Sequence, residues 1–172
     1  MALTAGLAKD CNPNSGGIQR IALANVADIT TISQTSGTID TITMNGAATF
    51  FEIQVEQDSA EWRENGELVN GSLKYTQELE FYVRKNNATT AAALREIGEN
   101  LCGMVAIVLD TNGLHHVIGW SENLQLERPL KLASEAQTTG KELTDQAGSV
   151  ITLTAMSDEK CYPSSVTLAS LI

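Results

Sequence analysis

The fold class of this chain is decided by Leu73-Lys-Tyr-Thr-Gln-Glu-Leu-Glu-Phe-Tyr-Val-Arg84, in which apolar and polar side chains alternate. Successive residues of a β-strand point to opposite sides, so the alternation predicts a long strand that is buried on one face only. The apolar face would hold Leu73, Tyr75, Leu79, Phe81 and Val83, and the polar face Lys74, Thr76, Glu78, Glu80 and Arg84.

Upstream of this strand, the same reasoning predicts three more strands, at 18–24, 38–44 and 49–56. In the last of these, Phe51, Ile53 and Val55 alternate with Glu52, Gln54 and Glu56. Residues 25–33 have apolar side chains every third position, which favours a short helix or turn. Residues 57–72 follow neither period, so they are predicted to form a long loop.

Downstream, one helix is predicted at 89–102, because Leu94, Ile97 and Leu101 fall on one helical face and Gly103 can end the helix. The all-apolar run 104–109 predicts a buried strand, and Asp110-Thr-Asn-Gly113 predicts a hairpin turn. Further strands are expected at 114–120, 123–132 and 149–156, with a polar connection at 134–148.

These elements amount to about seven to eight strands and one helix. One helix cannot cover both faces of a sheet, so the expected fold is mainly β (α+β): a two-sheet β-sandwich or half-open barrel with one flanking helix. The length of 172 residues and the 42% hydrophobic content indicate one domain over 1–172. Residues 1–17 are a candidate flexible N-terminal arm.

The net charge of −10 excludes an electrostatic grip on nucleic acid, which requires Lys and Arg to neutralise phosphates. An anionic membrane would be repelled as well. The longest apolar run has only the six residues 104–109, and the start of the chain lacks the features of a secretory signal. We therefore expect synthesis in the cytoplasm and no membrane partner.

No catalytic, cofactor or metal site is predicted. His115 and His116 are strand neighbours that face opposite sides, so they cannot share one ion without a bend. Gly140-Lys141 lacks the earlier glycine of a phosphate loop, since Glu135 stands there. The acidic residues between 52 and 67 lack the order of a calcium loop and are predicted to form a solvated face.

The cysteines are predicted to be reduced and unreactive. Three thiols without a Cys-x-x-Cys spacing do not make a disulfide framework, and a nucleophilic cysteine would need both a positioned base and an electropositive setting. Cys102, at the apolar end of the helix, is expected in the core. Cys11 and Cys161 are expected in polar loops.

Trp62 lies between charged neighbours in the predicted loop, and two interpretations stay open. The ring can fold back onto the core. Alternatively Trp62, Leu68 and Val69 can anchor the loop to a neighbouring subunit, because aromatic anchors dominate interfaces.

The order of the elements also resembles a known family. It is carried by Gly16-Gly17-Ile18, the strand from Gly71 to Phe81, the helix, the hairpin Val105–Gly113, Gly140–Asp145 and the closing strand Val150–Thr154. Over residues 16–156 this pattern resembles tail-tube-like structural proteins of tailed bacteriophages, particularly those of phages and prophages of Bacteroidetes-type hosts.

The resemblance implies a non-enzymatic virion protein that forms rings, commonly hexameric, which stack into a tail tube and contact other tail proteins. DNA passes through such a tube without specific binding. The loop at 57–72 would reach an adjacent subunit, with Trp62, Leu68 and Val69 as contacts. One sheet would line the lumen, and the candidates for its acidic wall are Glu52, Gln54, Glu56, Glu78 and Glu80.

Three alternatives remain, and the last of them is a small-molecule enzyme, which a deep pocket with convergent titratable groups would favour. Tail terminators, head-tail connectors, decoration proteins and baseplate proteins are also phage structural modules of this general kind. A β-sandwich binding domain that recognises a partner through residues 57–72 is the second alternative.

Overall fold

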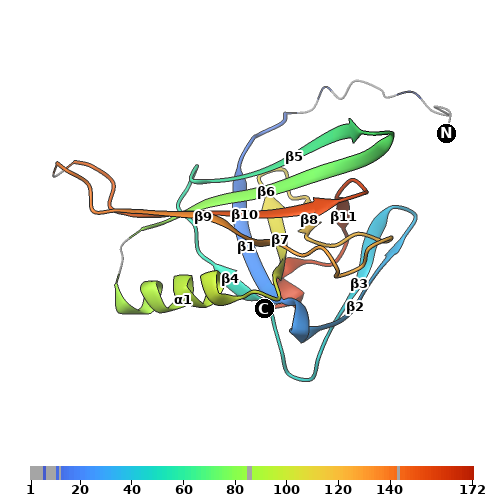
Figure 1. Ribbon diagram of the computed structural model, residues 1–172, viewed down its shortest axis with the longest axis horizontal. Helices are drawn as coiled ribbons and strands as arrows, with labels where there is room; N and C mark the ends of the chain where they lie inside the picture. The colour runs from blue at the N-terminus through green and yellow to red at the C-terminus, as the bar shows by residue number, and fades with distance from the viewer. Residues whose placement is uncertain (1–5, 7–10, 12, 85–86, 143) are drawn as a thin grey trace.

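The computed structural model describes Gly6, Cys11 and residues 13–84, 87–142 and 144–172. In this part of the chain, eleven strands form two sheets accompanied by one α-helix and two short 3-10 helices (Figure 1). The mainly β, two-sheet prediction is confirmed. Of the candidate N-terminal arm, residues 1–5, 7–10 and 12 lie outside the described residues.

The larger sheet has seven strands in the order β2-β3-β11-β8-β7-β1-β4. Its central strands β1, β7 and β8 are antiparallel, and the predicted turn at Asp110–Gly113 joins β7 to β8. The bounds are β1 Ile18–Asn25, β2 Ile29–Thr35, β3 Thr38–Met44, β4 Phe51–Ile53, β7 Met104–Asp110, β8 His115–Ile118 and β11 Tyr162–Ser164.

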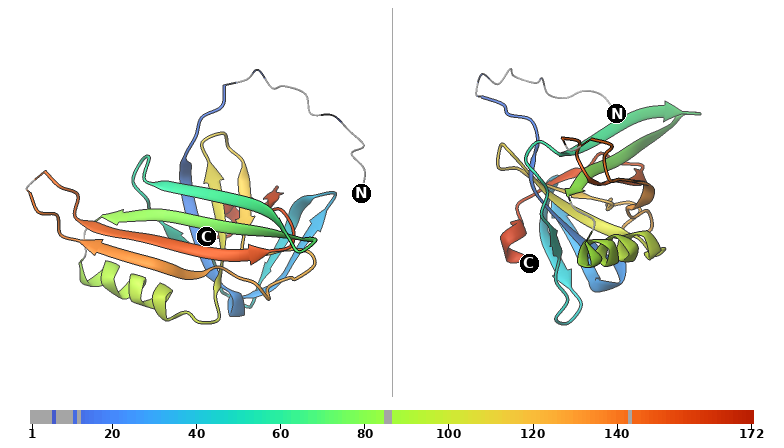
Figure 2. Two further views of the ribbon diagram at one scale, coloured as in Figure 1. Left: turned by 45° about the horizontal axis from the view of Figure 1, so that its top comes forward. Right: turned by 90° about the vertical axis from the view of Figure 1, so that its left-hand side faces the viewer.

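The smaller sheet has four antiparallel strands in the order β5-β6-β10-β9. The smaller sheet crosses over one face of the larger sheet, and α1 (Ala88–Glu99) lies beside its edge strand β9 (Figures 1 and 2). The bounds are β5 Ala60–Val69, β6 Ser72–Arg84, β9 Lys131–Thr138 and β10 Gly148–Ser157.

Two apolar clusters hold the sheets. The first lies between them and includes Leu79 and Phe81 of β6. The second covers the opposite face of the larger sheet, where the 3-10 helix Leu168–Ser170 packs. Strands β1 and β7 contribute alternate residues to both clusters, so they are buried on both faces. This explains why residues 104–109 are apolar without alternation.

The helix is confirmed with shorter bounds. Asn87 caps it, since its Oδ1 accepts a hydrogen bond from the Thr90 amide at 2.8 Å. Leu94 and Ile97 are buried against the first cluster. Leu101 lies beyond the last helical residue and is 81% exposed, so its predicted place on the buried face is wrong.

The predicted loop at 57–72 is wrong. Residues 60–69 form β5, and Asn70 and Gly71, with φ of +51° and +80°, turn the chain into β6. The sequence pattern does not reveal this strand, because β5 lies at the edge of its sheet and buries few side chains. Its outward face is charged, and its inward face carries Glu64 and Gly66 beside the single aromatic Trp62.

Three other predictions need correction. Residues 123–130 contain no strand, and β9 instead occupies part of the predicted polar connection, because an edge strand exposed on both faces shows no alternation. Within 25–33 only Val26–Asp28 is helical. The strand at 49–56 shrinks to β4; Phe50, just before it, is buried, and Phe51, its first residue, is 62% exposed.

Candidate functional site

The five candidates for an acidic lumen wall lie on two different sheets. Glu78 and Glu80 are on the outward face of β6 in the four-stranded sheet. Glu52 belongs to β4 of the seven-stranded sheet, and Gln54 and Glu56 follow it. The prediction treated the two strands as neighbours, but β5 separates them in sequence and they pair in different sheets.

All four of these glutamates have a basic partner. Arg63 of β5 lies 3.6 Å from both Glu78 and Glu80. Glu56 lies 3.0 Å from Arg84. The Nε of Arg20 lies 2.5 Å from Glu52, and this hydrogen bond lowers the pKa of that carboxyl group.

We call the outward side of the four-stranded sheet the outer face. Its registers place equal numbers of acidic and basic side chains among the described residues there. The excess negative charge of the chain is therefore not concentrated on this face. The residues are Glu61, Glu67, Glu78, Glu80, Arg63, Lys74, Arg84 and Lys131.

The three candidates for an inter-subunit contact lie on the β5–β6 hairpin, but only two of them are exposed. Trp62 points inward, packs against the first cluster, and its ring centroid lies 4.8 Å from that of His116. Leu68 and Val69 are at the hairpin tip, 73% and 43% exposed, beside the exposed Leu73. The ring thus folds back, while the tip remains free for a contact.

A polar bridge between the two sheets was missed by the sequence reasoning. Gln77 of β6 is fully buried, and its Oε1 accepts a hydrogen bond from the Gly119 amide of the opposite sheet at 3.0 Å. Its Nε2 donates to Glu64 at 3.2 Å, and Glu64 also accepts from the Cys161 amide at 2.6 Å. The available signal was Gln77 itself, the polar residue within the apolar alternation of 73–83.

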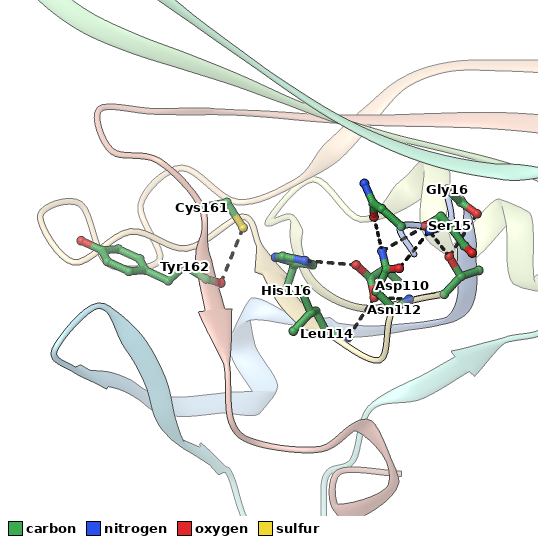
Figure 3. Close-up of polar contacts among 10 residues, drawn as sticks. Ser15, Gly16, Asp110, Asn112, Leu114, His116, Cys161 and Tyr162 are labelled. Carbon is green, nitrogen blue, oxygen red and sulfur yellow. Dashed lines mark hydrogen bonds and ion pairs between the residues drawn. The ribbon is translucent and has the colours of Figure 1, made fainter. Parts of the chain in front are cut away.

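A second polar group surrounds the β7–β8 turn (Figure 3). Asp110 caps the turn, because its Oδ1 accepts hydrogen bonds from the amides of Asn112 and Leu114. Asn112 also holds the segment before β1 through Ser15, by accepting from its amide and donating to its carbonyl oxygen. These bonds fix the chain entering β1 against the hairpin.

The histidines behave as predicted from strand geometry. His116 shares the inward face with Ile118, while the intervening Val117 belongs to the second cluster, so His115 and His116 point to opposite sides. Burial lowers the pKa of His116, against the opposing charges of Asp110 and Glu64. Within the described residues, no three His, Cys, Asp or Glu side chains gather as metal ligands.

The prediction for Cys102 is wrong: this residue is exposed, because the helix ends before it. Cys161 lies in the polar connection between β10 and β11, as expected, but its side chain is buried. Burial, reinforced by the charge of Glu64, raises the pKa of the Cys161 thiol. Cys11 is exposed.

The segment at Gly140-Lys141 has its own internal partner. Asp145 accepts hydrogen bonds from the amides of Lys141 and Glu142, both at 2.8 Å. These bonds lower the pKa of Asp145. Amides held by a carboxylate are not free for a phosphate, in line with the rejected phosphate loop.

Among the described helices, none is long and apolar enough to cross a membrane. No family model, curated protein or solved structure matches this chain.

Proposed function

We propose that this protein is a non-enzymatic virion structural protein of the tail-tube type, which self-assembles into stacked rings through which DNA passes. The observation that carries the proposal is the four-stranded sheet, both of whose edges, β5 and β9, are unpaired in the described chain. That the assembly is a phage tail tube is proposed from the resemblance of the element order to tail-tube-like proteins.

The two free edges support self-association. Strands β5 and β9 have ten and eight residues, and a long free edge is an aggregation liability for a monomer. Pairing β9 of one copy with β5 of the next would continue the sheet head to tail. Contacts of this heterologous kind close into a ring when the rotation between copies permits.

The β5–β6 hairpin supplies a second contact. Its tip extends beyond β10, whose last paired residue, Ser157, lies opposite Tyr75. Leu68, Val69 and Leu73 are exposed on this projection. Contiguous exposed apolar side chains mark an interaction surface, and an adjacent ring is the partner that fits the proposed assembly.

The outer face suits a wall along which DNA slides. Three of its four cations, Arg63, Lys74 and Arg84, lie within 4 Å of a carboxylate. Cations occupied by carboxylates bind phosphates less well than free ones. In this proposal Glu78 and Glu80 face the lumen with Glu61 and Glu67. Glu52 and Gln54 lie away from this face, and Glu56 reaches its margin through Arg84.

Light scattering and electron microscopy of the purified protein test the proposal. We expect rings or tubes whose yield rises with protein concentration. Ala136→Lys, which adds a charge to the exposed edge strand β9, should abolish them, whereas Thr43→Lys on exposed β3 of the other sheet should not. A strictly monomeric protein at every concentration would refute the proposal.

Shortening the β5–β6 tip separates this proposal from a β-sandwich binding domain. A tube protein without residues 68–73 should still form single rings through its sheet edges but lose stacking. A binding domain would be monomeric before the deletion and would lose a foreign ligand after it.

A further inference from the structure

A cavity of about 310 Å³ opens where the segment before β1, the start of β5 and the β7–β8 hairpin meet. This volume is at the small end of the range for ligand pockets. Ile18, Trp62 and Val108 give it an apolar wall, and Asp110 and His116 give it polar groups. We call it the Asp110 cavity.

Asp110 has one oxygen without a hydrogen-bond donor. Its Oδ1 is occupied by the two turn amides, whereas no donor reaches Oδ2 within the described residues. The nearest basic atom is Nε2 of His116 at 3.9 Å, too far for a hydrogen bond (Figure 3). The side chain is only 22% exposed, so water solvates this oxygen incompletely.

The charges around the cavity favour a positive occupant. Its lining includes the Asp110 carboxylate and no lysine or arginine, and the Glu61 side chain lies on the outer face. Arg63 approaches Glu61 only to 3.7 Å, and on the exposed side. His116 faces Asp110 on β7 and Glu64 on β5, with His115 beside it, and burial favours its neutral form.

We infer that the Asp110 cavity binds an organic cation, an alkylammonium or alkylguanidinium group. The charged end pairs with Oδ2 of Asp110, and the methylene groups lie against Val108 and Trp62. Trp62 offers carbon surface here, since its Nε1 is enclosed. The cation can belong to a free amine or to a lysine or arginine side chain of a partner protein. The site does not depend on ring assembly.

The two histidines make a direct assay, because the chain contains only His115 and His116. Proton NMR of the imidazoles, assigned with His115→Gln, is followed during titration with butylammonium and butylguanidinium. We expect a saturable shift of His116 alone, absent with butanol or sodium chloride. Affinity should fall at pH values well below the ordinary imidazole pKa of 6.5, as His116 becomes protonated and repels the cation.

Asp110→Asn removes the charge and retains an oxygen for the turn amides. It should weaken binding about tenfold or more, the range expected for one charge-assisted hydrogen bond. Asp40→Asn is the matched control. The Asp40 carboxylate also accepts two hydrogen bonds, from the hydroxyl groups of Ser33 and Thr35, but it lies on β3, away from the Asp110 cavity. Circular dichroism confirms that both variants are folded.

The source of the cation is decided by comparing 1,4-diaminobutane with the peptide acetyl-Gly-Arg-Gly-amide. Tighter binding of the diamine assigns the site to free amines, and tighter binding of the peptide assigns it to a partner's side chain. The inference is overturned if no probe shifts His116 saturably, or if Asp110→Asn binds as well as the wild type. Neither result bears on whether rings form.

Discussion

The bridge through Gln77 gives the sharpest prediction for stability. Gln77→Leu preserves the approximate volume and removes both hydrogen bonds that cross from β6 to Gly119 and to Glu64. The Gly119 amide is buried, so water cannot replace the lost acceptor. Glu64 keeps its hydrogen bond from Cys161, which limits the loss on that side.

The magnitude follows from the group left without a partner. An unsatisfied buried donor costs about 1–3 kcal/mol, and the lost bond to charged Glu64 adds to this, partly offset by the apolar leucine. We expect the free energy of unfolding to fall by about 2–3 kcal/mol. In a domain of this size, that corresponds to a decrease in Tm of roughly 5–10 °C.

Urea and thermal unfolding followed by circular dichroism measure the effect. Gln57→Leu is the matched control, because Gln57 is exposed and its replacement should change stability by less than about 0.5 kcal/mol. Gln77→Glu should destabilise more than Gln77→Leu at pH 7, since it places a second carboxylate beside Glu64. A Gln77→Leu protein as stable as the wild type would refute the bridge.

Three further predictions concern other parts of the chain. Cys102 should react with a thiol reagent in the native state, whereas Cys161 should react only on unfolding; equal rates for both thiols would contradict their placement. Gly103→Ala should lower Tm, because φ is +90° and a Cβ would lie 2.4 Å from Pro129; an unchanged Tm would show that the turn relaxes freely. Because the folded state lowers the pKa of His116 below its ordinary 6.5, its contribution to stability should be complete above pH 6.5 and decline as pH falls below it. His116→Gln should flatten this decline in urea midpoints measured from pH 7.5 to 5.0, and an identical decline in both proteins would exclude His116 as its source.

The local pattern of apolar residues was sufficient to predict a strand or helix wherever that element buries a continuous apolar face. The alternation at 73–84 gave β6, the run at 104–109 gave β7, and the spacing of Leu94 and Ile97 gave α1. In each case the core selects side chains at the period of the element, so the period appears in the sequence.

Edge strands escaped the same reasoning. In strand β5, Trp62 is the one large apolar side chain packed against the first cluster, and β9 is exposed along nearly its whole length. Their pairing depends on backbone hydrogen bonds to β6 and β10, which leave no hydrophobic period in the sequence. The loop predicted at 57–72 and the connection predicted at 134–148 therefore became the two edges on which the proposed assembly depends.

For the candidate functional residues too, the sequence identified some individual side chains, whereas their contacts became visible only in the structure. Sequence identified Trp62, Leu68 and Val69 as unusual in their context, and strand geometry separated His115 from His116. Only the tertiary structure could show that Gln77 meets Gly119, or that Arg63 lies between Glu78 and Glu80. Such contacts join residues on different strands, and their distances depend on how the sheets pack.

The sequence by itself determined a β-rich domain with one helix and a surplus of ten negative charges, because composition and local period are properties of the chain alone. Tertiary structure decided where that charge lies. Register brings Arg63 of β5 opposite Glu78 of β6, and Lys74 of β6 opposite Glu67 of β5, so the outer face is balanced and the surplus lies elsewhere. The packing of the two sheets also leaves Oδ2 of Asp110 without a hydrogen-bond donor within the described residues. A partly buried carboxylate can bond only to the groups that packing places beside it, and here it faces a cavity.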